Sequence, residues 1–318
     1  MSMVDFRPRR LGHVNLYVSD LERSILFYEK ICGIELVRRE PEIRGGFHSN
    51  GNTHHDIGMI ELSRGVDRRG RDGKVQIAAS RGTEVGLNHL GWEMETEVEL
   101  VAAYDRLKAA GIRPYRLSDH QISHSVYIAD PDENVHEFYA DAIPDWRRIF
   151  NLEHEDLVTR EWDPHGEPPR SDRNYPVTPA IRSVAGAPLS PVRITGATIA
   201  TRNFDRMKDF FTAVAGLTPE SRDFRGKRAV VFSGSRRHPD LTLVEAGDGP
   251  IGLRLFAFSL AENVDLEAAA ARLTGVLPEK PRLVQADDRR SLVLRDPDGF
   301  QVEFYRSRSG EAVFPLAA

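Results

Sequence analysis

The sequence of 318 residues lacks several features that would assign it to a class at once. Its one cysteine, Cys32, cannot form a disulfide within the chain, so a reducing cytoplasm is the simplest location. No apolar run approaches the roughly 18 residues of a membrane helix, and residues 1–10 contain no apolar signal core. The net charge of −5 leaves no basic footprint for nucleic acid. We therefore expect a cytoplasmic protein without membrane or nucleic-acid partners.

What the chain does contain is one pattern repeated four times. A residue in a β-rich segment precedes a glutamate by 48 residues in four pairs, which are His13 and Glu61, His89 and Glu137, Ala197 and Glu245, and Leu255 and Glu303. Equal spacing indicates one duplicated structural unit. Only the first two copies carry a histidine at the first position of the pair. The pattern therefore predicts that the first half of the chain can hold a metal ion and that the second half cannot.

Each copy follows the same order of predicted elements. In the second copy, alternation and β-formers predict a strand over residues 88–94, a helix over 97–110 that ends at Gly111, and further strands near 112–117, 125–129 and 135–140. The other copies repeat this order, with helix stops at Gly33 and Gly216 in the first and third. The fold class that we predict is α+β, with four βαβββ modules paired into two domains.

The predicted domains are residues 1–142 and 192–318, as expected for a chain of this length at roughly 150 residues per domain. Between them, residues 143–191 are rich in proline and charge but contain Trp146 and Trp162. We interpret this segment as a packed strap rather than a flexible linker, because its apolar side chains need cover. The Arg- and Gly-rich residues 64–82 are interpreted as a solvated loop, with closure of a pocket as the alternative.

The repeated histidines and glutamates suggest a chemistry. Two histidines and one carboxylate suit Fe(II), Mn(II) or Zn(II), and such a set on one face of the metal suits non-haem iron that activates oxygen. Because side chains alternate along a strand, Glu137 shares its face with Tyr139 while His136 points away. By the same alternation His55 would lie on the same face of its strand as Glu61. His54 would lie on the opposite face, towards Asp56 or solvent.

The chain resembles the vicinal oxygen chelate superfamily, and within it the type I extradiol ring-cleavage dioxygenases. The resemblance is carried by GHVNL at residues 12–16, THHDIG at 53–58, LNHL at 87–90 and DHQISHSVYI at 119–128, which continues through an Asp-Pro turn to Glu137. It implies two vicinal-oxygen-chelate domains. It also implies Fe(II), with Mn(II) as the alternative, held by His13, His89 and Glu137.

The same resemblance implies an acid/base group at His55, with His120 and Tyr127 near the substrate oxygens. The implied reaction inserts O2 into a catechol-type aromatic ring next to its vicinal hydroxyls. Histidine suits the proton transfer that this reaction needs at neutral pH. In the familiar two-domain enzymes the metal lies in the C-terminal domain, whereas here its residues are in the N-terminal one. The loop before Tyr127 also looks about two residues shorter, so His124 competes with His120.

Two other functions stay open. Glyoxalase-type members use two histidines and two glutamates, and Glu61 at its matching spacing would complete such a site for a divalent-metal isomerase or lyase. A small-molecule-binding protein of the same superfamily would need no metal. For residues 192–318 we expect a degenerate, metal-free domain with a structural role, and for the whole chain a homo-oligomer, because sheet edges in such folds are commonly covered by pairing.

Overall fold

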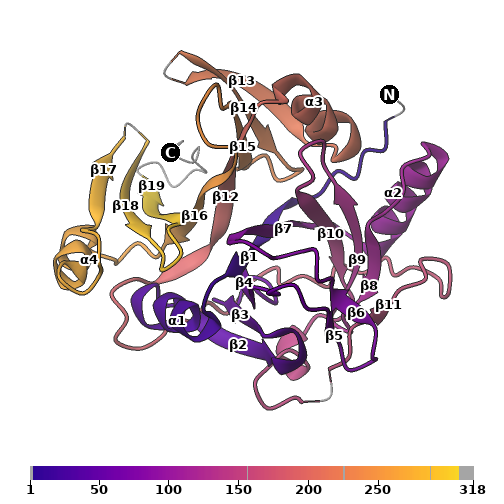
Figure 1. Ribbon diagram of the computed structural model, residues 1–318, viewed down its shortest axis with the longest axis horizontal. Helices are drawn as coiled ribbons and strands as arrows, with labels where there is room; N and C mark the ends of the chain where they lie inside the picture. Colours follow the sequence, from indigo (N-terminus) through magenta and orange to yellow (C-terminus); the bar gives the residue numbers. More distant parts are fainter. Residues whose placement is uncertain (1–2, 156, 225, 287, 308–318) are drawn as a thin grey trace.

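The computed structural model describes residues 3–155, 157–224, 226–286 and 288–307, and the βαβββ order occurs in it four times (Figure 1). The first module consists of β1 (Arg10–Val18), α1 (Leu21–Leu26), β2 (Glu35–Glu40), β3 (Gly45–Ser49) and β4 (Ile57–Glu61). The second consists of β7 (Gly86–Glu93), α2 (Glu97–Ala109), β8 (Arg116–Asp119), β9 (Ser123–Ala129) and β10 (Val135–Asp141).

The second half of the chain repeats this arrangement. The third module consists of β12 (Pro191–Thr201), α3 (Phe204–Asp209), β13 (Thr218–Phe224), β14 (Lys227–Ser233) and β15 (Pro239–Glu245). The fourth consists of β16 (Gly252–Leu260), α4 (Leu266–Leu273), β17 (Arg282–Gln285), β18 (Arg289–Arg295) and β19 (Gln301–Ser307). The predicted fold class is therefore confirmed.

Local sequence explains where the helices begin and end. The side chains of Asp20 and Thr96 accept a backbone N–H from the first turn of α1 and α2, as N-caps do. After the first three helical segments the chain passes through Gly33, Gly111 and Gly216 at φ of 77°, 72° and 73°. Glycine adopts this left-handed conformation at little cost, so the predicted helix stops are confirmed.

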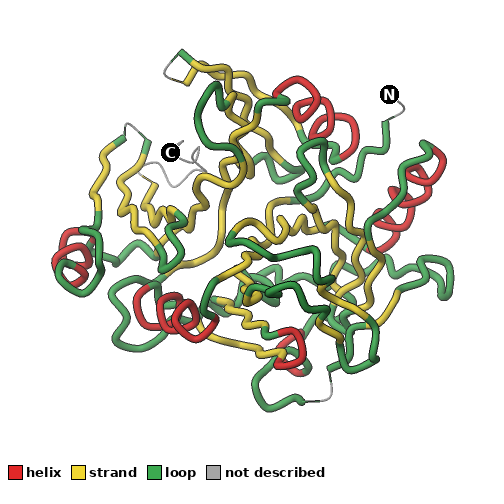
Figure 2. The backbone as a smooth tube through the Cα atoms, viewed as in Figure 1, coloured by secondary structure: helices red, strands yellow, loops and turns green. Residues whose placement is uncertain are grey.

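The modules pair into two curved sheets, and the helices lie around their outside (Figure 2). The first sheet has the order β11-β8-β9-β10-β7-β1-β4-β3-β2, where β11 (Arg160–Glu161) comes from the segment between the halves. The second has the order β13-β14-β15-β12-β16-β19-β18-β17. A separate hairpin is formed by β5 (Arg68–Arg69) and β6 (Val75–Ile77). None of the described helices is long and apolar enough to cross a membrane.

The strand register shows that the spacing of 48 residues does not mark equivalent positions in all four modules. In the second module Glu137 pairs with Gly91, two residues after His89. In the first module, Glu61 instead pairs with Val18, five residues after His13. The first and third modules differ from the second and fourth in the lengths of their internal loops. The residues that lie 48 positions before each glutamate are therefore not structurally equivalent in the four modules.

The two halves complete each other at two β-bulges. The register of β1 against β7 shifts between Leu11 and His13, and the Leu11 N–H at this bulge donates to Asp240 Oδ1 of β15 at 2.9 Å. In the second sheet the register of β12 shifts after Ile194, whose N–H donates to Asp56 Oδ1 at 3.0 Å. A bulge leaves backbone groups without ladder partners, and each half supplies the carboxylate that satisfies the other.

We predict that Asp240→Asn lowers both stability and metal affinity, although Asp240 lies in the half without the histidines. Asp240 also accepts the Gly234 N–H at 2.8 Å, and an amide can replace only one of these two acceptors. The loss should be about 1–3 kcal/mol in the free energy of unfolding by urea. The exposed Asp248→Asn is the control. Lost stability with unchanged metal affinity would mean that the bulge does not position His13.

A second prediction concerns His48 in β3, whose wholly buried side chain has a pKa lowered to about 3 by burial. Between pH 3 and 6.5 the unfolded chain binds a proton at this residue and the folded chain does not, so stability should fall as the pH falls. In His48→Gln this contribution is absent. The wild type should lose about 2 kcal/mol more than the variant between pH 7.5 and 5.0 in urea unfolding. Parallel losses in the two proteins would contradict the burial argument.

Candidate metal centre and its cavity

Three side chains from adjacent strands bring their donor atoms together in the first sheet. His13 Nε2 lies 2.8 Å from Glu137 Oε2 and 3.2 Å from His89 Nε2, and His89 Nε2 lies 3.0 Å from Glu137 Oε2. His13 comes from β1, His89 from β7 and Glu137 from β10, and all three are buried. The structure therefore brings together the three residues that the sequence suggested as ligands.

The spacing of these atoms fits a divalent transition metal. Two ligands at right angles, each with a bond of about 2.1 Å, have donor atoms about 3 Å apart. The three distances of 2.8, 3.0 and 3.2 Å therefore correspond to three ligands on one face of an octahedron. Two imidazoles and a carboxylate in this arrangement suit Fe(II) or Mn(II) and leave the opposite face for other ligands.

A close approach of backbone and side chain makes room for the cluster. On the strand beside β1, Gly91 stands opposite His13, and a Cβ at that position would lie 2.1 Å from the His13 ring. Any other residue at 91 would push the ring away from Glu137. The bulge at Leu11 and the glycine at 91 together orient the first ligand.

The tautomers and charges of the ligands also suit a metal. His89 Nδ1 donates to Asn88 Oδ1 at 2.6 Å, which leaves the Nε2 lone pair for a metal. Burial lowers the pKa of His13 to about 4. Burial alone would raise the pKa of Glu137, but its interactions with the His13 and His89 side chains outweigh this effect and hold the pKa well below its usual range. His13 is thus neutral and Glu137 is charged near pH 7.

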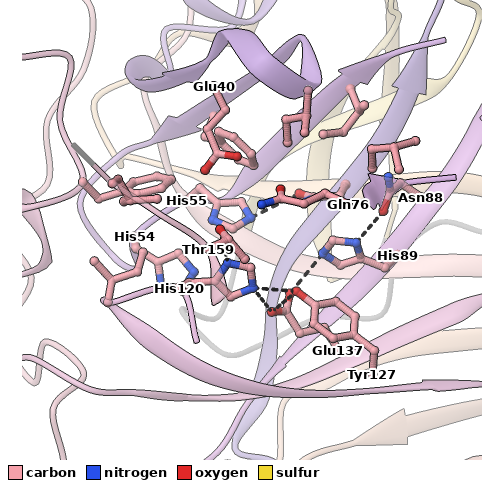
Figure 3. A pocket seen from close by; sticks show the side chains of 18 of the residues that line it. Glu40, His54, His55, Gln76, Asn88, His89, His120, Tyr127, Glu137 and Thr159 are labelled. Atoms are coloured by element: carbon pink, nitrogen blue, oxygen red, sulfur yellow. Dashed lines mark hydrogen bonds and ion pairs between the residues drawn. The ribbon is translucent and has the colours of Figure 1, made fainter. Parts of the chain in front are cut away.

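A chain of hydrogen bonds supports the carboxylate from behind. Tyr127 donates its hydroxyl proton to Glu137 Oε1 at 2.5 Å, and His120 Nε2 lies 3.0 Å from the Tyr127 hydroxyl (Figure 3). His120 Nδ1 lies 3.2 Å from Thr159 Oγ1, which belongs to the segment between the halves. Burial lowers the pKa of His120 to about 3, so its imidazole is neutral.

His55 lies on the other side of the metal cluster. Its ring stacks on that of His13 with the centroids 4.0 Å apart, and its Nε2 lies 3.2 Å from Asn15 Oδ1. Burial lowers its pKa well below the ordinary value, so His55 is also neutral near pH 7.

The parity argument was wrong for His54, because both histidines precede β4 and strand alternation does not apply to them. His54 is buried beside the cluster, lines the cavity and pairs with Asp141 at 3.3 Å instead of facing Asp56 or solvent. Donor atoms of His13, His54 and His55 also lie within 4.8 Å of one another, a looser group than the two-histidine–glutamate set.

Two other candidates lie away from the cluster. Glu61 is the last residue of β4 and pairs with Val18 of β1. The proposal of Glu61 as a fourth ligand is wrong, because its carboxylate forms an ion pair with Arg44 at 2.7 Å. His124, the competitor of His120, hydrogen-bonds Glu97 at 2.5 Å and stacks on Trp162. Of these two histidines, only His120 lines the cavity above the metal ligands.

The cavity above the cluster has a volume of about 620 Å³, including its open mouth. Its walls come from both modules, from the hairpin β5–β6 and from the segment 143–191, and they comprise Asn15, Glu40, Ile43, Phe47, His54, His55, Ile60, Gln76, Ile77, Asn88, His89, Arg116, His120, Ile122, Tyr127, Glu137, Phe150, Leu157 and Thr159. Gln76 and Ile77 show that the Arg- and Gly-rich residues 64–82 form part of the wall, so the interpretation as a solvated loop was incomplete. Sequence patterns gave no signal for Glu40, Gln76 or Arg116.

The corresponding place in the second half holds an arginine. Glu303 pairs with Ala257 as Glu137 pairs with Gly91. The residue opposite Ala257 is Gly196, so Gly196, and not Ala197, is the position equivalent to His13. The Glu303 carboxylate accepts hydrogen bonds from Arg289 Nη2 at 3.1 Å and from Ser291 Oγ at 2.5 Å, all fully buried. A guanidinium thus supplies the positive charge that this buried carboxylate requires.

Paired βαβββ modules with two histidines and a glutamate in one sheet define a metal-binding class of proteins. The chain belongs to the Glyoxalase/Bleomycin resistance protein/Dioxygenase superfamily, whose family model matches residues 10–138 and 193–304. This match also confirms the family resemblance and the pairing of the modules.

Individual relatives are more distant. A lactoylglutathione lyase from Schizosaccharomyces pombe is 25% identical over 144 residues, which is 41% of this chain and 47%, less than half, of the lyase. The fold resembles that of a catechol 2,3-dioxygenase, with a TM-score of 0.64, 16% identity and coverage of 96% of this chain and 90% of that one. It also resembles the Mn(II)-bound glyoxalase from Novosphingobium aromaticivorans, with a TM-score of 0.64, 16% identity and coverage of 98% and 86%.

The geometry of the cluster predicts which carboxylates hold a metal. Glu137→Gln and His89→Ala each remove a donor, so the affinity for Fe(II) or Mn(II) should fall by more than about 100-fold. This loss exceeds the one typical of replacing a residue that only hydrogen-bonds to a ligand. Glu61→Gln should bind as the wild type does, because Glu61 pairs with Arg44. Metal content after anaerobic loading and desalting measures this. Loss of metal from Glu61→Gln would restore the four-ligand site.

Proposed function

We propose that this chain is an Fe(II)-dependent extradiol dioxygenase whose active site lies in the domain of residues 1–142, with Mn(II) as the alternative metal. The substrate is a catechol-type ring, and both atoms of O2 enter the product as the ring carbon–carbon bond beside the two hydroxyls breaks. The observation that carries the proposal is the three-donor cluster, with spacings of 2.8–3.2 Å, open to a cavity that His55, His120 and Tyr127 also line.

When bound, iron(II) supplies an electron path between the catechol ring and O2. His55 manages a proton beside it. With Nε2–H donated to Asn15 Oδ1, the tautomer leaves Nδ1 as the basic nitrogen, which has no partner among the described residues. The neutral imidazole accepts the proton of a substrate hydroxyl at Nδ1 and returns it to the product.

Tyr127 and His120 hold the opposite side of the site. The Tyr127 hydroxyl keeps the Glu137 carboxylate turned so that Oε2 faces the two histidines. Thr159 and Tyr127 together fix the His120 ring, which lies on the cavity wall where the substrate oxygens would be bound. Apolar side chains such as Phe47 and Phe150 exclude water from the reacting ring.

A second candidate is a divalent-metal isomerase or lyase, which the likeness to the Schizosaccharomyces pombe lyase favours. This function requires a different assignment from the one built on Glu61, whose carboxylate lies with Arg44. His55, His120 and Tyr127 have an evident task in catechol cleavage, and we therefore prefer the dioxygenase. A metal-independent binding protein is the third reading, and it leaves the His13–His89–Glu137 cluster without a purpose.

The function is tested by loading the protein anaerobically with Fe(II) and mixing it with a panel of catechols in air-saturated buffer. We expect O2 uptake in step with a yellow ring-opened product. His55→Asn should keep its metal and lower kcat by about 100-fold or more, as loss of a general base does. The exposed His165→Asn is the matched control.

Two results would count against the proposal. Silence across the panel with a tightly bound metal would favour an isomerase or lyase. Equal loss of metal from His55→Asn and His89→Ala would make His55 a ligand instead of an acid/base group.

A further inference from the structure

The cavity contains two opposite charges that the metal cluster does not use. Its walls also contain apolar side chains, such as those of Ile43, Phe47 and Phe150. Glu40 at the end of β2 and Arg116 at the start of β8 also line it. In the first sheet β2 is the last strand at one end and β8 is the second strand from the other end, and the sheet curves so that both face one space. The two charges therefore reach the cavity from opposite sides.

The side chain of Glu40 has no hydrogen bond or ion pair with the described part of the chain. Arg38 donates to the Asn151 carbonyl at 3.2 Å and acts on the Glu40 carboxylate through its charge alone, while Glu42 pairs with Arg71 at 2.8 Å. Burial raises the pKa of Glu40 to about 6, so the carboxylate is charged at neutral pH but would gain from a cationic partner. In Figure 3 its carboxyl group points into the cavity towards Gln76 and His55.

Arg116 is held in place without an acidic partner. Its Nη1 donates to the Gln76 carbonyl at 3.4 Å, and its guanidinium lies 4.4 Å from the centre of the Tyr127 ring. Its Nε is buried and has no hydrogen-bond partner among the residues described. No ion pair joins it to an acid in that part of the chain, Glu40 included. A buried donor on a fixed cation is a ready partner for a carboxylate.

Partly buried charges without partners cost free energy, and a ligand of complementary charge removes that cost. On the proposed function, the catechol hydroxyls anchor the ring at the metal cluster, and the ring substituent extends along the cavity. We propose that the substrate is a catechol whose ring carries a short amino-acid side chain, with its ammonium group bound by Glu40 and its carboxylate by Arg116. A substituent with one charge satisfies only one of the two residues.

Four catechols of similar size test this inference. They are 3,4-dihydroxyphenylalanine with both charges, dopamine with the ammonium group alone, 3-(3,4-dihydroxyphenyl)propanoate with the carboxylate alone, and 4-ethylcatechol with neither. Calorimetric titration of the Zn(II)-loaded protein without O2 gives Kd apart from turnover. We expect the amino acid to bind about tenfold or more tightly than 4-ethylcatechol, with the singly charged compounds between them. With Fe(II) and O2, kcat/KM should follow the same order.

Two variants separate the charges. Glu40→Gln should weaken binding of the two ammonium compounds by about tenfold and leave the propanoate and 4-ethylcatechol unchanged. Arg116→Gln should do the reverse, weakening only the two carboxylates. The exposed Glu42→Gln and Arg113→Gln are matched controls and should preserve every Kd. Metal content and thermal unfolding confirm that each variant is folded.

The wild-type series decides the matter even if a variant fails to fold. Equal Kd values for the four catechols, or tightest binding of 4-ethylcatechol, would overturn the inference while O2 uptake could still support a dioxygenase. Charge-ordered binding without O2 uptake on any catechol would support the charge recognition and contradict the proposed reaction. A loss on Glu40→Gln that is the same for all four compounds would also overturn it.

Discussion

Antiparallel pairing of β1 with β7 is the interaction on which the candidate site depends. It sets Asn15 opposite His89 and His13 opposite Gly91, so the leading strands of two separate modules present their histidines at one place. Parallel pairing of β7 with β10 then places Glu137 beside Gly91. A shift of one residue in either register would turn these side chains to the other face of the sheet. Backbone hydrogen bonds, more than contacts between side chains, therefore determine the donor geometry.

The bulge in β1 links this geometry to the second half of the chain. Asp240 accepts a hydrogen bond from the Leu11 N–H at the bulge of β1. Asp56 accepts one from the Ile194 N–H at the bulge of β12. The Asp-Pro turns repeat the exchange, because Asp132 accepts a hydrogen bond from Thr201 Oγ1 at 2.5 Å and Asp298 accepts one from the Ser19 N–H at 3.1 Å. The second half thus contributes to the site by fixing the strand that carries the first ligand.

Buried charge takes a different form in each half. In the first sheet Glu137 lies beside His13 and His89, whose Nε2 atoms could bind the same metal ion as its carboxylate. In the second, Glu303 keeps its carboxylate with a guanidinium from Arg289. A buried carboxylate requires a positive partner. An arginine side chain meets this requirement permanently, whereas a metal ion also leaves coordination positions at which a substrate can bind. This contrast supports the proposal that the first half carries the activity and the second is degenerate.

The order of the four modules could be read from the sequence, because strand alternation, N-caps and glycine stops act within a few residues. So could the three donors, since histidines at matching places in two copies and strand parity separated Glu137 from His136. His136 indeed points away, to Asp130 at 3.0 Å. Local patterns failed where backbone regularity ends: His54 precedes its strand, and its orientation depends on Asp141 from another module.

Other features of the site depend on contacts between segments that are far apart in the chain. The count of 48 residues suggested Glu61 as a ligand, but loop lengths within the first module carry it to Val18 and Arg44. Glu40 and Arg116 share one cavity because the sheet curves, and no periodicity along the chain records that curvature. The modules and the types of residue that are candidate ligands depend on neighbours along the chain, and could therefore be inferred before the structure. Register and curvature are set by pairing between distant segments, so the structure alone decided which donors meet and which charges surround them.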